Sequence, residues 1–191
     1  MSTRAVYGFR IDGEEKLTYN HSDGYPDYLG RHILTWAQQT GVARMREIAR
    51  GLERVAKDST PTPEQIAACR RWLNREVSTG SEQEWYSLLR EAQGCPEAWE
   101  QGLRYFIDGR TELHADDTWC EWGYVLDLDL EILEVYSRKP YAYWDDDTHR
   151  YGLRRLLFVP LNDLPDEERF VLRCDELDHA AWAALQADLD R

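Results

Sequence analysis

The stretch TRAVYGFRIDGEEKLTYNHSDGYP, residues 3–26, decides the fold. Alternating apolar residues predict a strand over Thr3–Ile11. Asp12-Gly13 is a strong two-residue turn signal, so Lys16–His21 is expected to return as the antiparallel partner. Asp23–Pro26 then ends the second strand, because glycine permits positive φ and proline lacks an amide donor. The inward face of the first strand is formed by Ala5, Tyr7, Phe9 and Ile11.

The centre of the chain has the periodicity of helices. Apolar residues recur at spacings of three and four from Tyr28 and again over Val42–Lys57. Thr62-Pro63 is an N-cap followed by proline, which predicts a helix to about Val77. Ser81-x-x-Glu84 is a capping box for another helix. Pro96 is expected to start one more, which runs through Phe106 and closes at Asp108-Gly109.

After residue 115 the pattern changes to that of strands. Trp122–Leu128 and Ile132–Tyr136 predict a hairpin, and Leu156–Leu161 predicts a further strand. Arg169–Cys174 is a candidate for one more strand, and Asp178–Leu189 for a closing helix.

Strands at both ends with helices between them predict the α+β class. We expect a single domain over residues 1–191. The N-terminal hairpin and the C-terminal strands would form one mostly antiparallel sheet, and a helical insert over residues 41–107 would pack on it.

The charge of the chain is unevenly distributed. The 191 residues carry a formal net charge of −13. Residues 1–100 have 13 Lys+Arg and 15 Asp+Glu (net −2), whereas residues 101–191 have 10 and 21 (net −11). Direct nucleic-acid binding needs clustered cations and is therefore disfavoured. A basic partner such as a basic protein surface, a cation, or simple solubility is favoured.

The sequence also gives expectations about compartment and cofactors. It has no apolar run of membrane-spanning length and no secretory signal, so we expect a cytoplasmic protein that makes no membrane contact. The widely spaced cysteines indicate reduced, packed thiols. Phosphate-loop, dinucleotide-binding, nucleophile-elbow and HExxH motifs are absent, and we assign no cofactor and no metal.

The segment Tyr19–Pro26 concentrates polar chemistry at the end of a strand, where scaffolds often present functional groups. Tyr19, His21 and Asp23 share one face, so His21 and Asp23 could share a substrate, a proton or a metal. The alternative is that Asp23 makes an Asx turn and His21 forms an ordinary hydrogen bond near the sheet edge.

The opening Met1–Arg4, the motif His21-x-Asp23-Gly24-Tyr25-Pro26 and a following helix with Gly30 resemble a known group. These are small, uncharacterised proteins of bacteria and phages that begin Met-x-Thr-Arg and carry His-x-Asp-Gly-Tyr-Pro. The resemblance covers about the first 35 residues and extends to the strand pair at 122–136. It implies a special site and names no activity.

A second, weaker similarity is to N-terminal nucleophile hydrolases of the choloylglycine type. It rests on Ser2, on the Asp12-Gly13 turn and on the polar residues 20–23 of the second strand. The similarity implies that Ser2 attacks a carbonyl after removal of Met1, with the free α-amino group as base. Asn20 or a backbone amide would stabilise the oxyanion, and Arg4 would supply positive charge.

A second polar concentration is Asp145-Asp146-Asp147-x-His149, together with Asp116 and Asp117. EF-hand spacing is absent, so a solvated acidic loop is favoured over a cation site. Aromatic residues flank the loop and could help it to bind a basic peptide: Tyr141, Tyr143, Trp144 and Tyr151. The tryptophans that we expect at a ligand are Trp119, Trp122 and Trp144.

The first functional hypothesis is a small bacterial or phage enzyme, a hydrolase or transferase that acts on a small molecule or peptide at the end of the hairpin. His21 would be the general acid or base, Asp23 would orient it, and Arg4 would bind an anionic group. The candidate catalytic residues are Ser2, Arg4, Asn20, His21 and Asp23, and the candidate substrate-binding residues are Tyr19, Tyr25 and Trp122.

The second hypothesis is a non-catalytic acidic protein, such as a phage factor that mimics nucleic acid and occupies a basic surface on a host protein. A toxin or immunity component is a third alternative.

Overall fold

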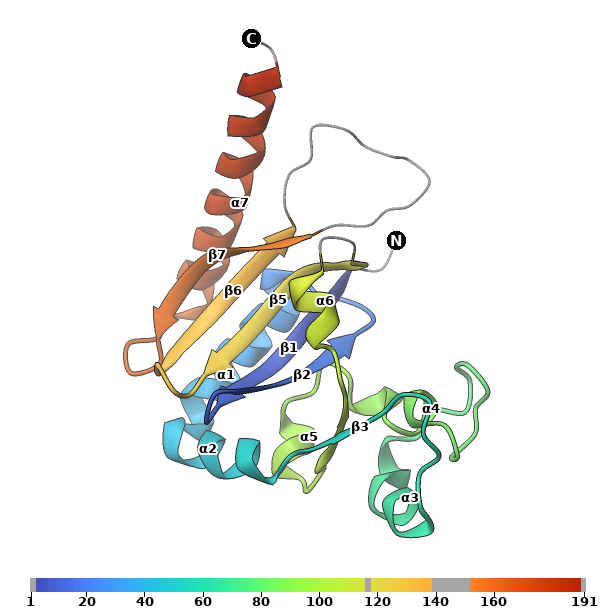
Figure 1. The fold of residues 1–191 in the computed structure, drawn as a ribbon. Coiled ribbons are helices and arrows are strands. Elements are labelled where there is room, and N and C mark those ends of the chain that lie inside the picture. The colour runs from blue at the N-terminus through green and yellow to red at the C-terminus, as the bar shows by residue number, and fades with distance from the viewer. Residues whose placement is uncertain (1–2, 116–117, 139–151, 190–191) are drawn as a thin grey trace.

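The computed structural model describes residues 3–115, 118–138 and 152–189 (Figure 1). Its centre is a five-stranded sheet of order β2-β1-β5-β6-β7. The strands are β1 (Arg4–Ile11), β2 (Glu14–Asn20), β5 (Cys120–Asp127), β6 (Ile132–Arg138) and β7 (Leu153–Pro160). Neighbouring strands are antiparallel except for β1 and β5, which run parallel. The predicted α+β class, with hairpins from both ends of the chain in one mostly antiparallel sheet, is confirmed.

The Asp12-Gly13 turn forms as predicted and anchors the hairpin. Asp12 and Gly13 both have positive φ, 53° and 74°, as the tight turns of hairpins require. Their backbone amides donate hydrogen bonds to the carboxylate of Asp129, at 2.8 and 2.9 Å. The β1–β2 turn is thereby tied to the β5–β6 turn.

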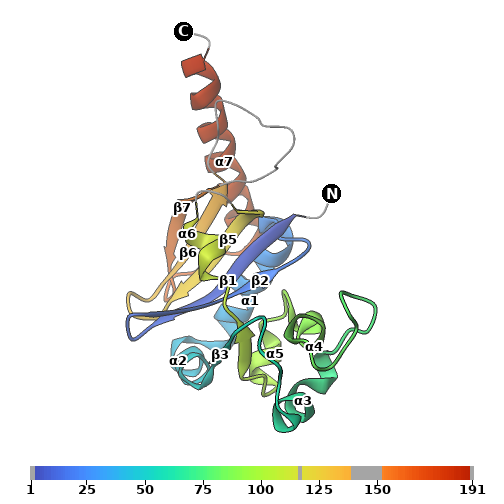
Figure 2. The same ribbon diagram turned by 45° about the vertical axis from the view of Figure 1, so that its right-hand side comes forward.

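Helices cover both faces of the sheet to different extents (Figures 1 and 2). One face is covered by η1 (Pro26–Gly30), α1 (Arg31–Thr40), α2 (Val42–Gly51) and α7 (Glu167–Leu189), and the other by the short α6 (Arg110–His114). The larger core contains a group of aromatic rings. Trp99 lies 4.8 Å from Phe9 and 5.4 Å from Tyr7 between ring centroids, and Trp36 contacts both Phe9 and Trp99.

The central segment lies beyond the β2 edge of the sheet (Figure 2). It consists of β3 (Glu53–Val55), α3 (Pro63–Cys69), η2 (Arg70–Trp72), α4 (Trp85–Leu88), η3 (Arg90–Ala92), α5 (Glu97–Glu100) and β4 (Tyr105–Ile107). β3 and β4 pair in parallel as a small second sheet. Residues 41–107 are therefore not helical throughout, and their status as an insert stays a prediction.

Two predicted helices are wrong at their C-terminal ends. The helix expected over Val42–Lys57 ends at Gly51, because glycine is a poor helix former and the next residues extend to pair with β4. The helix expected from Pro96 through Phe106 ends at Glu100. Gly102 has a φ of 98°, outside the helical range, and Phe106 belongs to β4.

Three further predictions concern caps and boundaries. The Thr62 cap is confirmed, with a reciprocal capping box to Gln65, but this helix ends at Cys69 and not near Val77. The capping box expected at Ser81 is wrong, because Glu84 is itself the N-cap of α4 and accepts hydrogen bonds from three hydroxyl groups. The candidate strand Arg169–Cys174 is also wrong and lies in α7.

The cysteines are free, as expected: Cys69, Cys120 and Cys174 are buried and Cys95 is partly buried. Across the described ranges, no helix combines the length and the apolar character that a bilayer span requires. Ser2 and the acidic loop with its flanking aromatic residues, including Asp116 and Asp117, lie outside the described residues.

Candidate functional site

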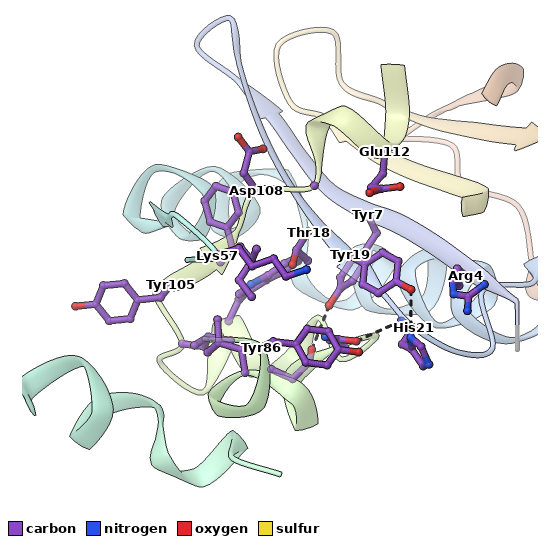
Figure 3. Close-up of a pocket in the computed structure, with 18 of the residues that line it drawn as sticks. Arg4, Tyr7, Thr18, Tyr19, His21, Lys57, Tyr86, Tyr105, Asp108 and Glu112 are labelled. Carbon is purple, nitrogen blue, oxygen red and sulfur yellow. Dashed lines mark hydrogen bonds between the residues drawn. The ribbon is translucent and has the colours of Figure 1, made fainter. Parts of the chain in front are cut away.

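A pocket of about 430 Å³ lies where the N-terminal hairpin meets the central segment (Figure 3). This volume is in the usual range for small-molecule sites, roughly 300–1,000 Å³. The hairpin contributes Arg4, Tyr7, Thr18, Tyr19 and His21. The central segment contributes Lys57, Tyr86, Leu89, Ala92, Gln93, Trp99, Leu103, Tyr105, Phe106 and Ile107. The remaining lining comes from Asp108, Gly109, Glu112 and Trp119.

One side of the pocket is closed by the chain as it crosses the edge of the sheet. After β4 the backbone passes over β2, where the Gly109 amide donates a 2.7 Å hydrogen bond to the Leu17 carbonyl. A Cβ at position 109 would lie 3.0 Å from the carbonyl carbon of Thr18, so this approach requires glycine. The crossing carries the chain to α6 on the opposite face.

Tyr7 forms part of an apolar wall, and its hydroxyl group is already occupied. It donates to the Ala92 carbonyl at 3.2 Å and accepts from the Gly94 amide at 3.1 Å. Burial raises the pKa of Tyr7 far above its ordinary value, so the phenol stays neutral. The ring presents apolar surface beside Trp99.

Tyr19 and His21 form a hydrogen-bonded pair at the end of β2 (Figure 3). The Tyr19 hydroxyl lies 3.1 Å from Nδ1 of His21. Burial raises the pKa of Tyr19 to about 12, so the phenol is protonated at neutral pH. Because a hydroxyl both donates and accepts, this contact fits either neutral tautomer of the imidazole.

Gln93 connects His21 to Arg90. Its Oε1 accepts a hydrogen bond from the His21 backbone amide at 3.2 Å and another from Nη1 of Arg90. Partial burial, followed by the charges of Arg90 and Arg4, lowers the pKa of His21. The imidazole is therefore neutral at pH 7, which is the form that can accept a proton.

The arginines near His21 rest on aromatic rings. Arg4 lies 5.4 Å from the ring centroid of Trp119, and Arg90 lies 5.9 Å from that of Tyr86. Within residues 3–115, 118–138 and 152–189, neither guanidinium group pairs with a carboxylate at 4.0 Å or less. This end of the pocket is therefore electropositive.

Three of the predicted site residues line the pocket: Arg4, Tyr19 and His21. Asp23, expected to orient His21, is exposed and takes a left-handed conformation with a φ of 56°. Its carbonyl accepts a hydrogen bond from the Leu29 amide, and it is not among the lining residues. Tyr19, and not Asp23, contacts the imidazole at 3.1 Å.

The other predicted site residues lie away from the pocket. Asn20 is buried, and its Nδ2 donates to the Ser22 carbonyl at 2.5 Å, which fixes the end of the strand. Tyr25 is 46% exposed at the start of η1, and Trp122 is buried in the larger core. Of the tryptophans expected at a ligand, Trp119 lines the pocket, whereas Trp144 lies outside the described residues.

Several lining or neighbouring residues come from the central segment and are not predicted from the sequence: Lys57, Tyr86, Arg90 and Gln93. Tyr86 and Arg90 are four residues apart, a spacing compatible with one helical face. That spacing gives no indication that they lie beside His21.

Comparisons of the chain with protein-family models, with curated proteins and with solved structures find no match. The two resemblances drawn from the N-terminal motifs therefore stay predictions. In the part of the chain that the structure describes, no three His, Cys, Asp or Glu side chains are grouped so that they could hold a metal ion.

Proposed function

We propose that this chain is a hydrolase or transferase that acts on a small molecule or peptide in the pocket, with His21 as the proton-transfer group. The observation that carries the proposal is the convergence of Arg4, Tyr19 and His21 on a concave pocket with an apolar wall. Such a pocket, with a few polar groups and a titratable residue of shifted pKa, is typical of an active site.

In the proposed step, the oxygen of water or of an acceptor hydroxyl attacks the electrophilic centre of the substrate. A bond forms between that oxygen and the centre, and the bond to the leaving group breaks. The attacking group gives its proton to Nε2 of His21, which then returns it to the leaving group. This requires that Nδ1–H donates to the Tyr19 oxygen, so that Nε2 keeps its lone pair.

Arg4 and Tyr19 have supporting roles in this proposal. Tyr19 orients the ring through its 3.1 Å contact, the role that the sequence had assigned to Asp23. The Arg4 guanidinium would stabilise the negative charge that develops during the attack. The N-terminal nucleophile version depends on Ser2 and stays a prediction; the intact mass of the mature chain tests whether Met1 is removed.

Hydrolysis of 4-nitrophenyl acetate tests the proposal, because a neutral imidazole that takes a proton from the attacking water accelerates hydrolysis of an activated ester. We expect His21→Gln to lower the protein-dependent rate at pH 7 by at least about tenfold. His179→Gln is the matched control, since His179 is an exposed histidine on α7. A wild-type rate no higher than that of a folded His21→Gln protein would overturn the proposal.

The acidic interaction protein remains the alternative. Its support is the net charge of −11 over residues 101–191. Asp145–Asp147, on which partner binding would depend, lie outside the described residues. Association with a basic protein should weaken steeply with added salt if this alternative is correct.

A further inference from the structure

Positive charge gathers around this pocket although the chain as a whole is acidic. Arg4 and Lys57 line the pocket, and Arg90 stacks on Tyr86, which also lines it. Among the described residues, none of the three cations forms an ion pair. Arginines elsewhere in the described residues commonly form ion pairs. Examples are Arg46–Glu131, Arg50–Asp12 and Arg54–Glu14. Unpaired cations in a protein of net charge −13 favour an anionic ligand here.

The two arginines are also held in place before any ligand binds. Trp119 supports Arg4, and Tyr86 supports Arg90, whose Nη1 also donates to Gln93. Stacking uses the flat face of a guanidinium group and leaves its N–H edge for an oxyanion. A pre-ordered side chain loses less conformational entropy when it forms a charge-assisted hydrogen bond.

Of the two carboxylates that line the pocket, Asp108 is neutralised by arginines and Glu112 is held by a hydroxyl group. Asp108 is paired with Arg110 at 2.7 Å and with Arg54 at 3.4 Å. Glu112 accepts a hydrogen bond from the Thr118 hydroxyl. The charge of Asp108 is thus compensated, whereas no carboxylate of the described residues pairs with Arg4 or Arg90.

The apolar part of the lining forms a wall that fits a flat apolar group. Leu89, Trp99 and Phe106 line it together with the ring of Tyr7, whose hydroxyl is occupied by backbone partners. Aromatic side chains favour offset or edge contacts with another ring. We propose that the substrate is an aromatic compound bearing a carboxylate or phosphate, with its ring on this wall and its oxyanion at Arg4 and Arg90. This inference rests on the proposed function, because it names the substrate class of the same site.

Calorimetric titration with three probes tests this inference: naphthalene-2-carboxylate, 2-naphthyl phosphate and the uncharged naphthalene-2-carboxamide. At low ionic strength, we expect at least one anion to bind about tenfold or more tightly than the amide. The tighter anion identifies the carboxylate or the phosphate as the natural group. The double variant Arg4→Gln/Arg90→Gln should lose about tenfold or more in affinity for the anion and little for the amide.

Two further variants make the result specific. Arg71→Gln is a matched control, because Arg71 also stacks on an aromatic ring, Trp72 at 5.0 Å, but does not line the pocket. Its affinity for the anions should equal that of the wild type. Ala92→Phe enlarges a side chain that lines the pocket and should abolish binding of all three probes; circular dichroism confirms that each variant is folded.

Four results would overturn the inference: an amide that binds as tightly as both anions, a double variant with wild-type affinity for the anions, anion binding that survives Ala92→Phe, or no binding of any probe. The 4-nitrophenyl acetate assay uses an uncharged ester and the His21→Gln variant. If that assay succeeds while the anion test fails, the proposed function stands and only the substrate class is wrong.

Discussion

Asp127 on β5 accepts a hydrogen bond from the Arg10 guanidinium across the parallel pair that joins the N-terminal hairpin to the C-terminal strands. The other oxygen of Asp127 accepts from the amides of Asp129 and Leu130, at 3.0 and 2.9 Å, and so shapes the β5–β6 turn. Arg10 also pairs with Glu134 and Glu15, each at 3.0 Å. One guanidinium group therefore links strands from both ends of the chain.

Replacing Arg10 should destabilise the fold strongly. The side chains of Asp127 and Glu134 are only 1% and 3% exposed, so Arg10→Met leaves two buried carboxylates without this partner. Breaking a buried ion pair in this way costs about 3–5 kcal/mol of unfolding free energy. Urea denaturation followed by tryptophan fluorescence measures the loss. As a control, Arg44→Ala removes an exposed pair with Glu47 and should cost less than about 1 kcal/mol. Equal losses in the two variants would contradict the role of Arg10.

The same network predicts acid sensitivity. Burial alone would raise the pKa of Glu134, but hydrogen bonds from Arg155 and Tyr136 and the charge of Arg10 hold it below its ordinary value of 4.5. A carboxylate with a lowered pKa in the folded state stabilises the protein above pH 4.5, and this contribution is lost as pH falls below that value. Urea midpoints between pH 7 and pH 3 should therefore fall on the acid side. Glu134→Gln should flatten this part of the profile, and an unchanged slope would argue against Glu134 as its source.

The crossing at Gly109 should not tolerate a side chain. A Cβ there would meet backbone atoms of Leu17, Thr18 and Tyr19 at 3.0–3.2 Å, and a backbone cannot move aside as a flexible side chain can. We expect Gly109→Ala to lower the unfolding free energy by about 1–3 kcal/mol. Gly51→Ala is the control, because its nearest atom would be at 3.9 Å and alanine favours the helix that ends there. Thermal unfolding should separate the two variants clearly; equal melting temperatures would contradict the steric argument.

The predictable parts of the fold depend on local signals. The N-terminal hairpin follows from alternation in β1 and from the Asp12-Gly13 turn, both contained in adjacent residues. The end of α2 cannot be predicted from such local signals, because Leu52 and Val55 fit the apolar face of a helix as well as a short strand. The strand forms only because β4, distant in sequence, supplies its partner. Phe170 and Cys174 are four residues apart and buried, a helical spacing that the short window Arg169–Cys174 does not distinguish from a strand.

The residues of the candidate site also fall into those that local sequence signals predict and those that only tertiary contacts bring together. Arg4, Tyr19 and His21 are predictable as polar residues at one end of a hairpin. Asp23 is two residues beyond His21 and would share its face only if the strand continued, whereas β2 ends at Asn20 and the chain turns. Arg90 and Gln93 reach His21 through tertiary contacts, the backbone hydrogen bond from His21 to Gln93 spanning 72 residues. Such contacts leave no pattern in a single sequence.

The final prediction concerns the charges that act on His21. Charged and titratable groups near its ring among the described residues include Tyr19 on β2, Arg4 on β1 and Arg90 on η3. Burial is the largest cause of its lowered pKa, and the two arginines add to it by repelling the imidazolium ion. Arg90→Gln removes one positive charge but leaves the burial, so the pKa of His21 should rise part of the way toward 6.5.

An NMR titration of the His21 ring protons measures this pKa directly. Arg71→Gln removes an arginine that also stacks on an aromatic ring but is not among the causes of the His21 shift, and it should leave the titration unchanged. Because the pKa is lowered in the folded state, His21 stabilises the protein above its ordinary pKa, and this contribution is lost as pH falls. His21→Gln should remove that dependence near pH 6. An equal pKa of His21 in the wild type and in Arg90→Gln would contradict this prediction. It would show that Arg90 does not act on the imidazole ring and does not contribute to the electropositive end of the pocket.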